Sequence, residues 1–207
     1  MRHLVFFFFF TWLFCQEKYP VDTIIKSKKT SLFNKIFLLP IAGWQRVSYN
    51  SNFFNCQYFP SCSNYGAKAI GEYGIIRGSI IASERITRCN PFALHYHLEL
   101  NRPFHDSDGR LIDPINQNKF SNSTRSPLVS AILSAIIPGT GRMYAGRTMD
   151  GIMGFWSFYL TSSLAYNLFS DNRYSLGSLF GTIAAFTYLG EIYGAWRSAK
   201  YYQKLEE

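Results

Sequence analysis

Two long apolar stretches near the C-terminus place the strongest constraint on the fold. Residues 151–169, GIMGFWSFYLTSSLAYNLF, carry no charge, and residues 175–196 carry a single charged side chain, Glu191. The turn-like sequence SDNRY lies between them. A helix that crosses a bilayer needs about 20 mostly apolar residues. The pattern therefore predicts a transmembrane helical hairpin.

Glu191 is the exception within this predicted hairpin. It lies six residues before Arg197, and charged side chains near the end of a spanning helix can extend toward the membrane interface. We expect Glu191 to do so rather than to line a proton or ion pathway. Small residues at 177, 178, 181, 184 and 185 would let the two helices approach closely.

The middle of the chain carries most of the positive charge. From Lys26 to Arg88 there are nine basic and two acidic residues, a balance of +7, whereas the whole chain has a formal charge of +8. Beside membrane segments this charge favours anionic lipid headgroups, with each nearby Lys or Arg contributing on the order of 1 kcal/mol. No nucleic-acid-binding motif accompanies it, so we expect no nucleic acid partner. A solvated basic face is the alternative.

Residues 26–50, KSKKTSLFNKIFLLPIAGWQRVSYN, have the pattern of an amphipathic helix that Pro40 ends or kinks. Basic residues next to an apolar face that contains Phe and Trp are typical of a helix lying in the membrane interface. Packing of this face on the protein's own core fits the pattern equally well. The apolar positions are Leu32, Phe33, Ile36, Phe37 and Leu39.

Residues 61–89 are predicted to form a pair of short helices, the second of which runs from about Ile75 to Arg88. The hydroxyl of Ser61 or Ser63 can cap the first helix, and Gly74 can take the positive φ that ends it. In the second helix Glu84 precedes Arg88 by four residues, which is the favourable order for an ion pair within a helix.

Cys56, Cys62 and Cys89 leave four interpretations open. His95 or His97 could complete a zinc site, but the five residues between the first two cysteines exceed the roughly two to four of zinc knuckles, so no metal is predicted. A disulfide between Cys62 and Cys89 would need an oxidising compartment. No cysteine-hydrolase signature surrounds any of them, so no catalytic residue is predicted. A buried structural knuckle is favoured.

The middle region resembles the YidD family, the small bacterial membrane protein insertion efficiency factors. The family pattern is approximately Cys-Arg-aromatic-x-Pro-Thr-Cys-Ser-x-Tyr, a Tyr/His-Gly turn, and Arg-x-x-Arg-Cys-Asn-Pro. The resemblance covers about residues 44–115, and Gln57 stands where the family usually has Arg. The residues that we assign to the family motif and its structure are Cys56, Pro60, Cys62, Ser63, Tyr65, Gly74, Cys89, Asn90 and Pro91.

This resemblance implies a non-enzymatic accessory factor that assists insertion or folding of membrane proteins at the bacterial inner membrane. Its implied partners are lipid headgroups, the membrane insertase and nascent membrane proteins, and no cofactor is expected. Within the basic region we predict that Arg77, Arg85 and Arg88 contact lipid headgroups or a partner.

The stretch from Ser126 to Phe155 resembles a bacterial membrane domain of unknown function. Its hallmark is Ser-x-x-x-Pro-Gly-x-Gly-x-x-Tyr before a helical hairpin, and Arg142 stands where that domain often has Gln. This resemblance implies no activity. The matching residues are Ser134, Pro138, Gly139, Gly141 and Tyr144.

Residues 1–15, MRHLVFFFFFTWLFC, are either a signal peptide or a short N-terminal anchor. The apolar run fits a signal-peptide core of about 7–15 residues, but a clear cleavage site is missing. Export would favour a second function, a disulfide-linked envelope protein of structural role. The basic flanks of the hairpin instead place the YidD-like region on the cytoplasmic face, which we favour. A membrane-bound metal or thiol protein is a third alternative.

The expected fold is mostly α. A small helical hairpin domain with an amphipathic helix would occupy residues 26–115 and would resemble the YidD family. A linker at 116–127 would lead to a membrane domain at 128–207, with transmembrane helices at about 151–169 and 175–196.

Overall fold

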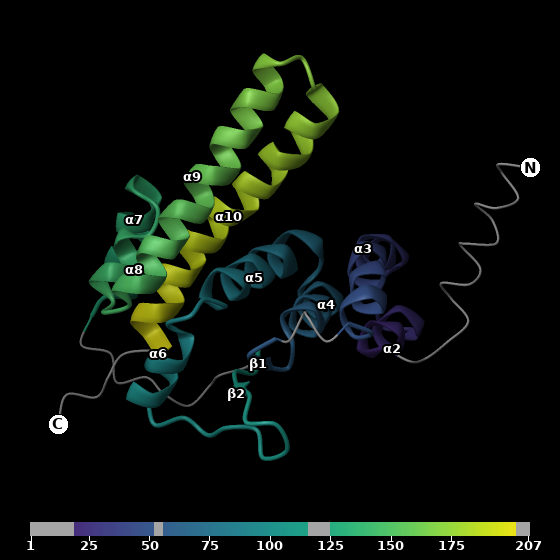
Figure 1. Ribbon diagram of the computed structural model, residues 1–207, viewed down its shortest axis with the longest axis horizontal. Coiled ribbons are helices and arrows are strands. Elements are labelled where there is room, and N and C mark those ends of the chain that lie inside the picture. Colours follow the sequence, from purple (N-terminus) through teal and green to yellow (C-terminus); the bar gives the residue numbers. More distant parts are fainter. Residues whose placement is uncertain (1–18, 52–55, 116–124, 202–207) are drawn as a thin grey trace, which may run out of the picture.

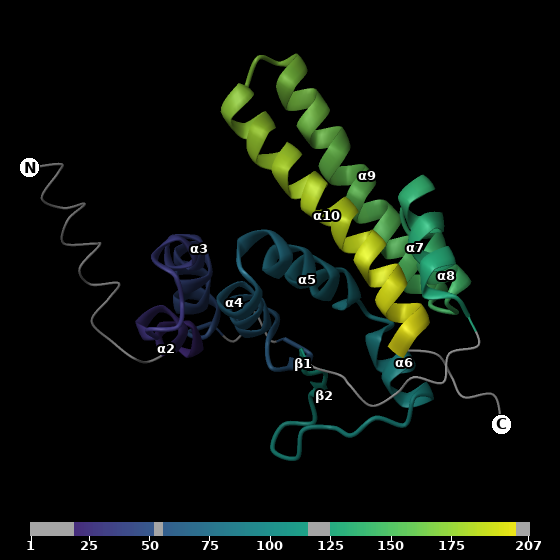
Figure 2. The ribbon, with the colours of Figure 1, turned by 180° about the vertical axis from the view of Figure 1, so that it is seen from behind.

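The structure, a computed structural model, describes residues 19–51, 56–115 and 125–201, which are mostly helical. Helices α9 and α10 form a long hairpin that projects from one side, α2, α3 and α4 lie on the other side, and α5 runs between the two groups (Figure 1 and Figure 2). The elements are α2 (Pro20–Lys26), α3 (Leu32–Ser48), β1 (Tyr58–Phe59), α4 (Cys62–Tyr73), α5 (Ile75–Arg88), α6 (Ala93–Glu99), β2 (Leu111–Ile112), α7 (Pro127–Ile136), α8 (Thr140–Tyr144), α9 (Thr148–Ser170) and α10 (Tyr174–Tyr201).

The predicted pair of short helices is present as α4 and α5. The Ser61 hydroxyl caps α4 by accepting a hydrogen bond from the Asn64 N–H at 3.4 Å, and Gly74 joins the helices with a φ of 81°. A Cβ atom on Gly78 would lie 2.5 Å from the Cα of Ile70. Glycine at position 78 therefore lets α5 approach the backbone of α4.

Helices α2 and α3 pack against α4 through a small apolar core. The side chain of Gln45 is buried there, where its oxygen accepts from the Val21 N–H at 3.1 Å and its nitrogen donates to the Ser63 hydroxyl at 3.3 Å. Because both ends of this buried amide are satisfied, it joins all three helices. Pro40 lies inside α3 and does not end it. The core residues are Tyr19, Val21, Leu38, Ala42, Ala67 and Ile70.

A short parallel pairing brings the segment after α6 back to the start of α4. Tyr58 of β1 pairs with Leu111 of β2, and Phe59 pairs with Ile112. The N–H of Asp113 then donates to the carbonyl of Phe59 at 3.0 Å. This pairing places the Asp113 carboxylate beside the C-terminal half of α5.

The Pro-Gly-x-Gly motif forms a close packing site between α7 and α8. Gly139 has a φ of 91°, and the N–H of Gly141 donates to the Ser134 hydroxyl at 3.0 Å. The Ser130 hydroxyl bonds the carbonyls of Gly141 and Ala195 at 2.7 and 2.9 Å. The serines and glycines thus hold α7, α8 and α10 together without bulky side chains. Pro138 is buried, and the carbonyl of Tyr144 accepts a hydrogen bond from Arg125.

The C-terminal half of α10 packs directly on α5. A Cβ atom on Gly190 would lie 2.8 Å from the Ser83 hydroxyl oxygen, and one on Gly194 would lie 2.9 Å from the Glu84 side chain. Both glycines are buried. The predicted C-terminal domain therefore packs on the helix pair of the predicted YidD-like domain, and most of the predicted linker at 116–127 lies outside the described residues.

The predicted transmembrane hairpin is wrong, although the helical hairpin itself exists. In the part of the chain that the structure describes, no helix combines the length and the apolar character needed to cross a membrane. Hydroxyl side chains lower the hydropathy of both helices; Ser157 and Thr182, for example, bond carbonyls of their own helices at 2.7 and 2.8 Å. At the other end of α10, Glu191 and Arg197 are charged and buried. The predicted signal peptide or anchor at 1–15 lies outside the described residues.

Alanine substitution at two helical glycines tests the close contact between α4 and α5. Alanine favours a helix over glycine by about 1 kcal/mol, and a Cβ atom on Gly43 of α3 would meet nothing within 4 Å. Gly43→Ala is therefore expected to raise the free energy of unfolding by about 0.5–1 kcal/mol. Gly78→Ala should instead lower it by about 1–3 kcal/mol, because the new methyl group overlaps the α4 backbone. Urea denaturation followed by circular dichroism measures both, and equal effects would contradict the predicted contact.

Candidate functional site

Glu84 of α5 is a buried carboxylate that three arginines share. It accepts from Arg88, one turn later in α5, at 3.0 Å. It also pairs with Arg197 of α10 at 2.8 Å and with Arg142 of α8 at 3.7 Å. All four side chains are buried. One carboxylate therefore joins three elements that are far apart in the sequence.

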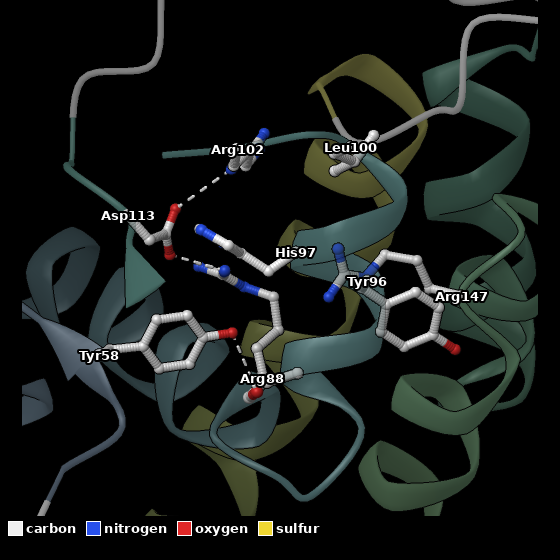
Figure 3. Close-up of a pocket in the computed structure, with 9 residues that line it drawn as sticks. Tyr58, Arg88, Tyr96, His97, Leu100, Arg102, Asp113 and Arg147 are labelled. Atoms are coloured by element: carbon white, nitrogen blue, oxygen red, sulfur yellow. Dashed lines mark hydrogen bonds and ion pairs between the residues drawn. The ribbon is translucent and has the colours of Figure 1, made fainter. Parts of the chain in front are cut away.

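Asp113 is a second shared carboxylate (Figure 3). It accepts a hydrogen bond from Arg85 and one from Arg88, the latter at 2.7 Å. Arg197 and Arg102 lie 3.5 and 3.8 Å from its other oxygen. Because Arg88 and Arg197 reach both Asp113 and Glu84, the two carboxylates belong to one network.

Glu191 of α10 extends this network. It is buried and accepts a hydrogen bond from the Nε of Arg142 at 3.0 Å. The prediction that its carboxylate reaches toward a membrane interface is wrong, because the residue faces α5 and α8. We call the set the ion-pair cluster. Its members are Glu84, Arg85, Arg88, Asp113, Arg142, Glu191 and Arg197.

The motif residue Asn90 connects the end of α5 to α9. Its amide nitrogen donates to the Asp150 carboxylate at 2.6 Å, and its amide oxygen accepts from the Phe92 N–H at 2.9 Å. Asp150 also pairs with Arg147 at 2.6 Å, and that guanidinium lies 4.3 Å from the ring centre of Tyr96. This arrangement explains why an asparagine suits position 90.

The arginines keep both shared carboxylates ionised. Burial by itself would raise the pKa of Glu84, but the nearby Arg88, Arg197 and Arg142 lower that pKa to about 2. Burial would likewise raise the pKa of Asp113, and its neighbouring arginines hold that pKa well below its usual value. Glu191 differs, because burial raises its pKa despite the contact with Arg142. Glu84 and Asp113 are therefore the permanent anions of the cluster.

A narrow pocket lies beside the ion-pair cluster (Figure 3). His97 faces it, and its Nε2 donates a hydrogen bond to the carbonyl of Pro103 at 3.0 Å. Burial lowers the pKa of His97. The cluster holds the charged groups of this pocket in ion pairs, an arrangement that fixes structure rather than supplying a nucleophile and base. Its lining residues are Tyr58, Arg88, Ala93, Tyr96, His97, Leu100, Arg102, Asp113 and Arg147.

The structure brings the three motif cysteines together. The sulfur atoms of Cys56, Cys62 and Cys89 all lie within 4.8 Å of one another, and all three are half-buried free thiols. The first two sulfurs are 3.6 Å apart. The contact with Cys62 lowers the pKa of Cys56, and the same contact raises the pKa of Cys62. The first thiolate to form is thus stabilised by its neighbours.

Helix α3 presents a continuous apolar surface to the outside. Leu32 is 79 % exposed, Phe33 63 % and Phe37 46 %, although all three are large apolar side chains. Leu32 and the exposed Ile36 lie four positions apart, as do Phe33 and Phe37, so these side chains share one face of the helix, opposite the buried Leu38 and Ala42. We call this surface the α3 apolar face. Its residues are Leu32, Phe33, Ile36, Phe37, Trp44 and Val47.

Basic residues flank the α3 apolar face. Lys28 and Lys29 are exposed and immediately precede α3. The Asn34 side chain donates to the Ile70 carbonyl at 3.4 Å, so the start of α3 lies beside the end of α4. The chain then turns into α5, where Arg77 is exposed. Positive side chains thus surround one end of the apolar surface.

The structure separates the three arginines that the sequence groups together. Arg77 is exposed, whereas Arg85 and Arg88 are buried in the ion-pair cluster. Arg85 also donates to the Pro60 carbonyl at 3.1 Å, and Arg197 donates to the Tyr65 hydroxyl at 3.1 Å. Arg85 and Arg88 therefore lie in the interior, where they pair with carboxylates. Contact with lipid headgroups or a partner stays a prediction for Arg77.

Sequence reasoning missed the members of the cluster that α8 and α10 contribute. Arg142 and Arg197 were interpreted as basic flanks of the predicted hairpin, and Glu191 was expected to reach a membrane interface. A usable signal was present, since charged residues within otherwise apolar stretches require partners. The partners themselves lie 49 residues apart for Arg142 and Glu191 and 113 apart for Arg197 and Glu84.

An exposed apolar helix face beside basic residues is typical of helices that lie in a membrane interface. A family model described as "Putative membrane protein insertion efficiency factor" matches residues 33–97, which include α3, α4 and α5. The chain belongs to this family, the YidD family.

Several curated relatives carry the same description. One from Colwellia psychrerythraea is 40 % identical over 65 residues, which is 31 % of this chain and 79 % of the relative. One from Oleidesulfovibrio alaskensis is 46 % identical over 59 residues, 28 % of this chain and 66 % of the relative. One from Exiguobacterium is 36 % identical over 58 residues, 28 % of this chain and 65 % of the relative. No solved structure matches the chain.

These comparisons confirm the resemblance to the YidD family and support an accessory role in membrane protein insertion. The family match begins at residue 33 and ends at 97, whereas the sequence predicted about 44–115. The additional residues at the start belong to α3. The family region therefore includes the α3 apolar face and excludes Asp113.

Replacing Glu84 by glutamine tests the ion-pair cluster. The change keeps the shape of the side chain but removes the charge that Arg88, Arg142 and Arg197 share. Removing one partner of a buried ion pair costs about 3–5 kcal/mol, and we expect the free energy of unfolding at pH 7 to fall by that amount. Because the folded-state pKa is about 2 against an ordinary 4.5, wild type loses this stabilisation as the pH falls through that window. The difference between the two proteins should therefore shrink there.

Asp108→Asn is the matched control for this substitution. Asp108 pairs with Arg110 at 2.7 Å, but both side chains are about one-third exposed. Loss of such a pair is expected to cost less than about 1 kcal/mol. Urea denaturation at several pH values measures both variants, and a similar loss in each would contradict a special role for the cluster.

Proposed function

We propose that this protein is a non-enzymatic accessory factor that binds the surface of the bacterial inner membrane through the α3 apolar face and assists insertion or folding of other membrane proteins. The observation that carries this proposal is the exposure of large apolar side chains on α3 beside exposed basic residues. The membership of the chain in the YidD family supports the accessory role.

The α3 apolar face suits an interface rather than a protein core. Its inner side is already packed, since Leu38, Ala42 and Gln45 are buried against α2 and α4. The outer side, which carries Leu32, Phe33 and Phe37, remains exposed. Lying in the boundary between headgroups and acyl chains would remove its Phe and Trp side chains from water.

The surrounding charge favours an anionic membrane surface. Lys28, Lys29 and Arg77 lie near the start of α3, where they could contact headgroups when the apolar face is inserted. Each basic residue near an anionic leaflet contributes on the order of 1 kcal/mol. Such binding supports placement on the cytoplasmic face, whose leaflet is the negatively charged one. Proximity to the insertase and to nascent membrane proteins would follow from this location.

The ion-pair cluster has a supporting role in this proposal. It holds α5 against α10 and holds Asp113 against both, so the α3–α4–α5 region is attached to the C-terminal helices. Membrane binding through α3 would then position the whole protein. No step of the proposed role requires bond making or breaking by the protein.

Vesicle binding tests the membrane-binding surface. The double variant Phe33→Ser, Phe37→Ser removes two rings from the α3 apolar face, which lie 5.3 Å apart. We expect its partition coefficient for phosphatidylglycerol-containing vesicles to fall at least about tenfold, which corresponds to about 1.4 kcal/mol. Co-sedimentation with the full-length protein measures this value, and uncharged vesicles should bind wild type more weakly.

The matched control replaces an equally exposed pair on another helix. Leu94 and Leu98 of α6 have the same four-residue spacing and are 47 % and 57 % exposed, and α6 lies far from α3 (Figure 1). Leu94→Ser, Leu98→Ser should leave binding within about twofold of wild type. An equal loss for both double variants would show that binding does not depend on the α3 apolar face.

Complementation tests the accessory role itself. In a strain that lacks the protein, wild type should restore the rate at which the translocated segments of newly made membrane proteins become accessible to protease added to spheroplasts. The α3 double variant should restore it poorly, because the protein no longer concentrates at the membrane. The α6 double variant should restore it fully. An unchanged insertion rate in the deletion strain would contradict the proposed function even if vesicle binding is confirmed.

A further inference from the structure

The three motif cysteines form a compact set of sulfur ligands. Cys56 precedes β1, Cys62 is the first residue of α4, and Cys89 follows the last residue of α5. Three separate elements therefore converge so that their sulfur atoms lie within 4.8 Å of one another. Tyr58, Ala93 and Leu111 pack around them as a small apolar core. Neither the ion-pair cluster nor the α3 apolar face uses these thiols.

The sulfur spacing fits coordination of a single ion. Zinc–sulfur bonds of about 2.3 Å in a tetrahedral site place neighbouring sulfurs about 3.8 Å apart. The observed separation of Cys56 and Cys62 is 3.6 Å, and the outer limit of 4.8 Å for the set requires only small side-chain movements. The five-residue gap that exceeds the usual zinc-knuckle spacing is thus compensated by the path of the chain through β1.

Amide groups donate hydrogen bonds to the sulfurs, as is usual around thiolates that bind metals. The Cys62 N–H donates to the Cys56 sulfur at 3.3 Å. The Gln57 amide nitrogen lies 3.6 Å from the Cys89 sulfur and 3.0 Å from the Asn90 carbonyl. Because the Asn90 carbonyl can only accept, the NH₂ group of the Gln57 amide, and not its oxygen, must lie on this side. The same NH₂ group therefore faces the Cys89 sulfur.

We propose that Cys56, Cys62 and Cys89 bind one thiophilic metal ion, Zn²⁺ or Cu⁺, through three sulfur ligands. Soft thiolate sets of this kind select these ions. Among the described residues, these three cysteines are the one group of at least three potential metal ligands whose ligand atoms lie this close together. His97 is held by the Pro103 carbonyl, and His95 lies near Glu99 at 3.4 Å. A trigonal Cu⁺ site would be complete with three sulfurs, whereas Zn²⁺ would take a water or an external ligand as its fourth.

The bound ion would fasten the start of α4 to the end of α5. Arg85, one turn before Cys89, donates to the Pro60 carbonyl, which lies between Cys56 and Cys62 in the sequence. The metal and the ion-pair cluster would therefore restrain the same turn from two sides. Metal binding is expected to raise the thermal midpoint of unfolding, because the ion binds the folded state.

Metal analysis of the full-length protein tests this proposal. The protein is purified under reducing, oxygen-free conditions, loaded separately with Zn²⁺, Cu⁺ or the spectroscopic probe Co²⁺, and desalted. We expect one ion per chain, sulfur-to-cobalt charge-transfer absorption, and three sulfur neighbours by X-ray absorption of wild type. Retention of zinc but not copper under mutual competition would assign Zn²⁺, and the reverse would assign Cu⁺.

Cysteine variants provide the matched comparison. Cys56→Ser, Cys62→Ser and Cys89→Ser should each lose most of the bound metal, whereas Cys15→Ser, the remaining cysteine of the chain, should retain it. Circular dichroism identifies any variant that fails to fold, and the X-ray absorption result on wild type does not depend on the variants. Failure of wild type to retain any of the three ions would overturn the proposal. A Cys56–Cys62 disulfide in protein isolated from cells would also overturn it.

Discussion

The burial of Glu84 among three arginines is the constraint on which the rest of the structure depends. A carboxylate without partners in a dry interior is strongly disfavoured, and here its partners come from α5, α8 and α10. Moving α10 away from α5 would leave Arg197 without its closest charge and would take from Glu84 one of its three arginines. In this chain the C-terminal helices therefore supply two of the three arginines that neutralise Glu84. The family match, which contains Glu84, itself ends at residue 97.

Local sequence rules predicted local structure well. The Ser61 cap, the turn at Gly74 and the pairing of Glu84 with Arg88 all depend on residues within one helical turn, and the structure confirms each. The same rules could not find the contact between Arg197 and Glu84, because nothing in the sequence near either residue identifies a partner 113 positions away. Arginines that resemble a basic surface in the sequence can therefore be buried.

The error in the C-terminal hairpin has a related cause. Length and the scarcity of charge predicted a membrane span, but these measures ignore hydroxyl groups and the direction in which a charge points. Glu191 was treated as an isolated charge in an apolar helix, whereas it is one half of an ion pair with Arg142. Gly190 and Gly194, for which no contact was predicted from the sequence, admit the side chains of α5 and α8.

The amphipathic pattern at 26–50 was compatible with either a core or an interface, and the structure shows why both interpretations were reasonable. Helix α3 has two apolar sides, one buried on α2 and α4 and one exposed. The buried side connects to the cluster through a short series of contacts: Gln45 bonds Ser63 in α4, and Arg197 bonds Tyr65 two residues later. Helix α4 is therefore fixed from both sides, by α3 through Gln45 and by α10 through Arg197.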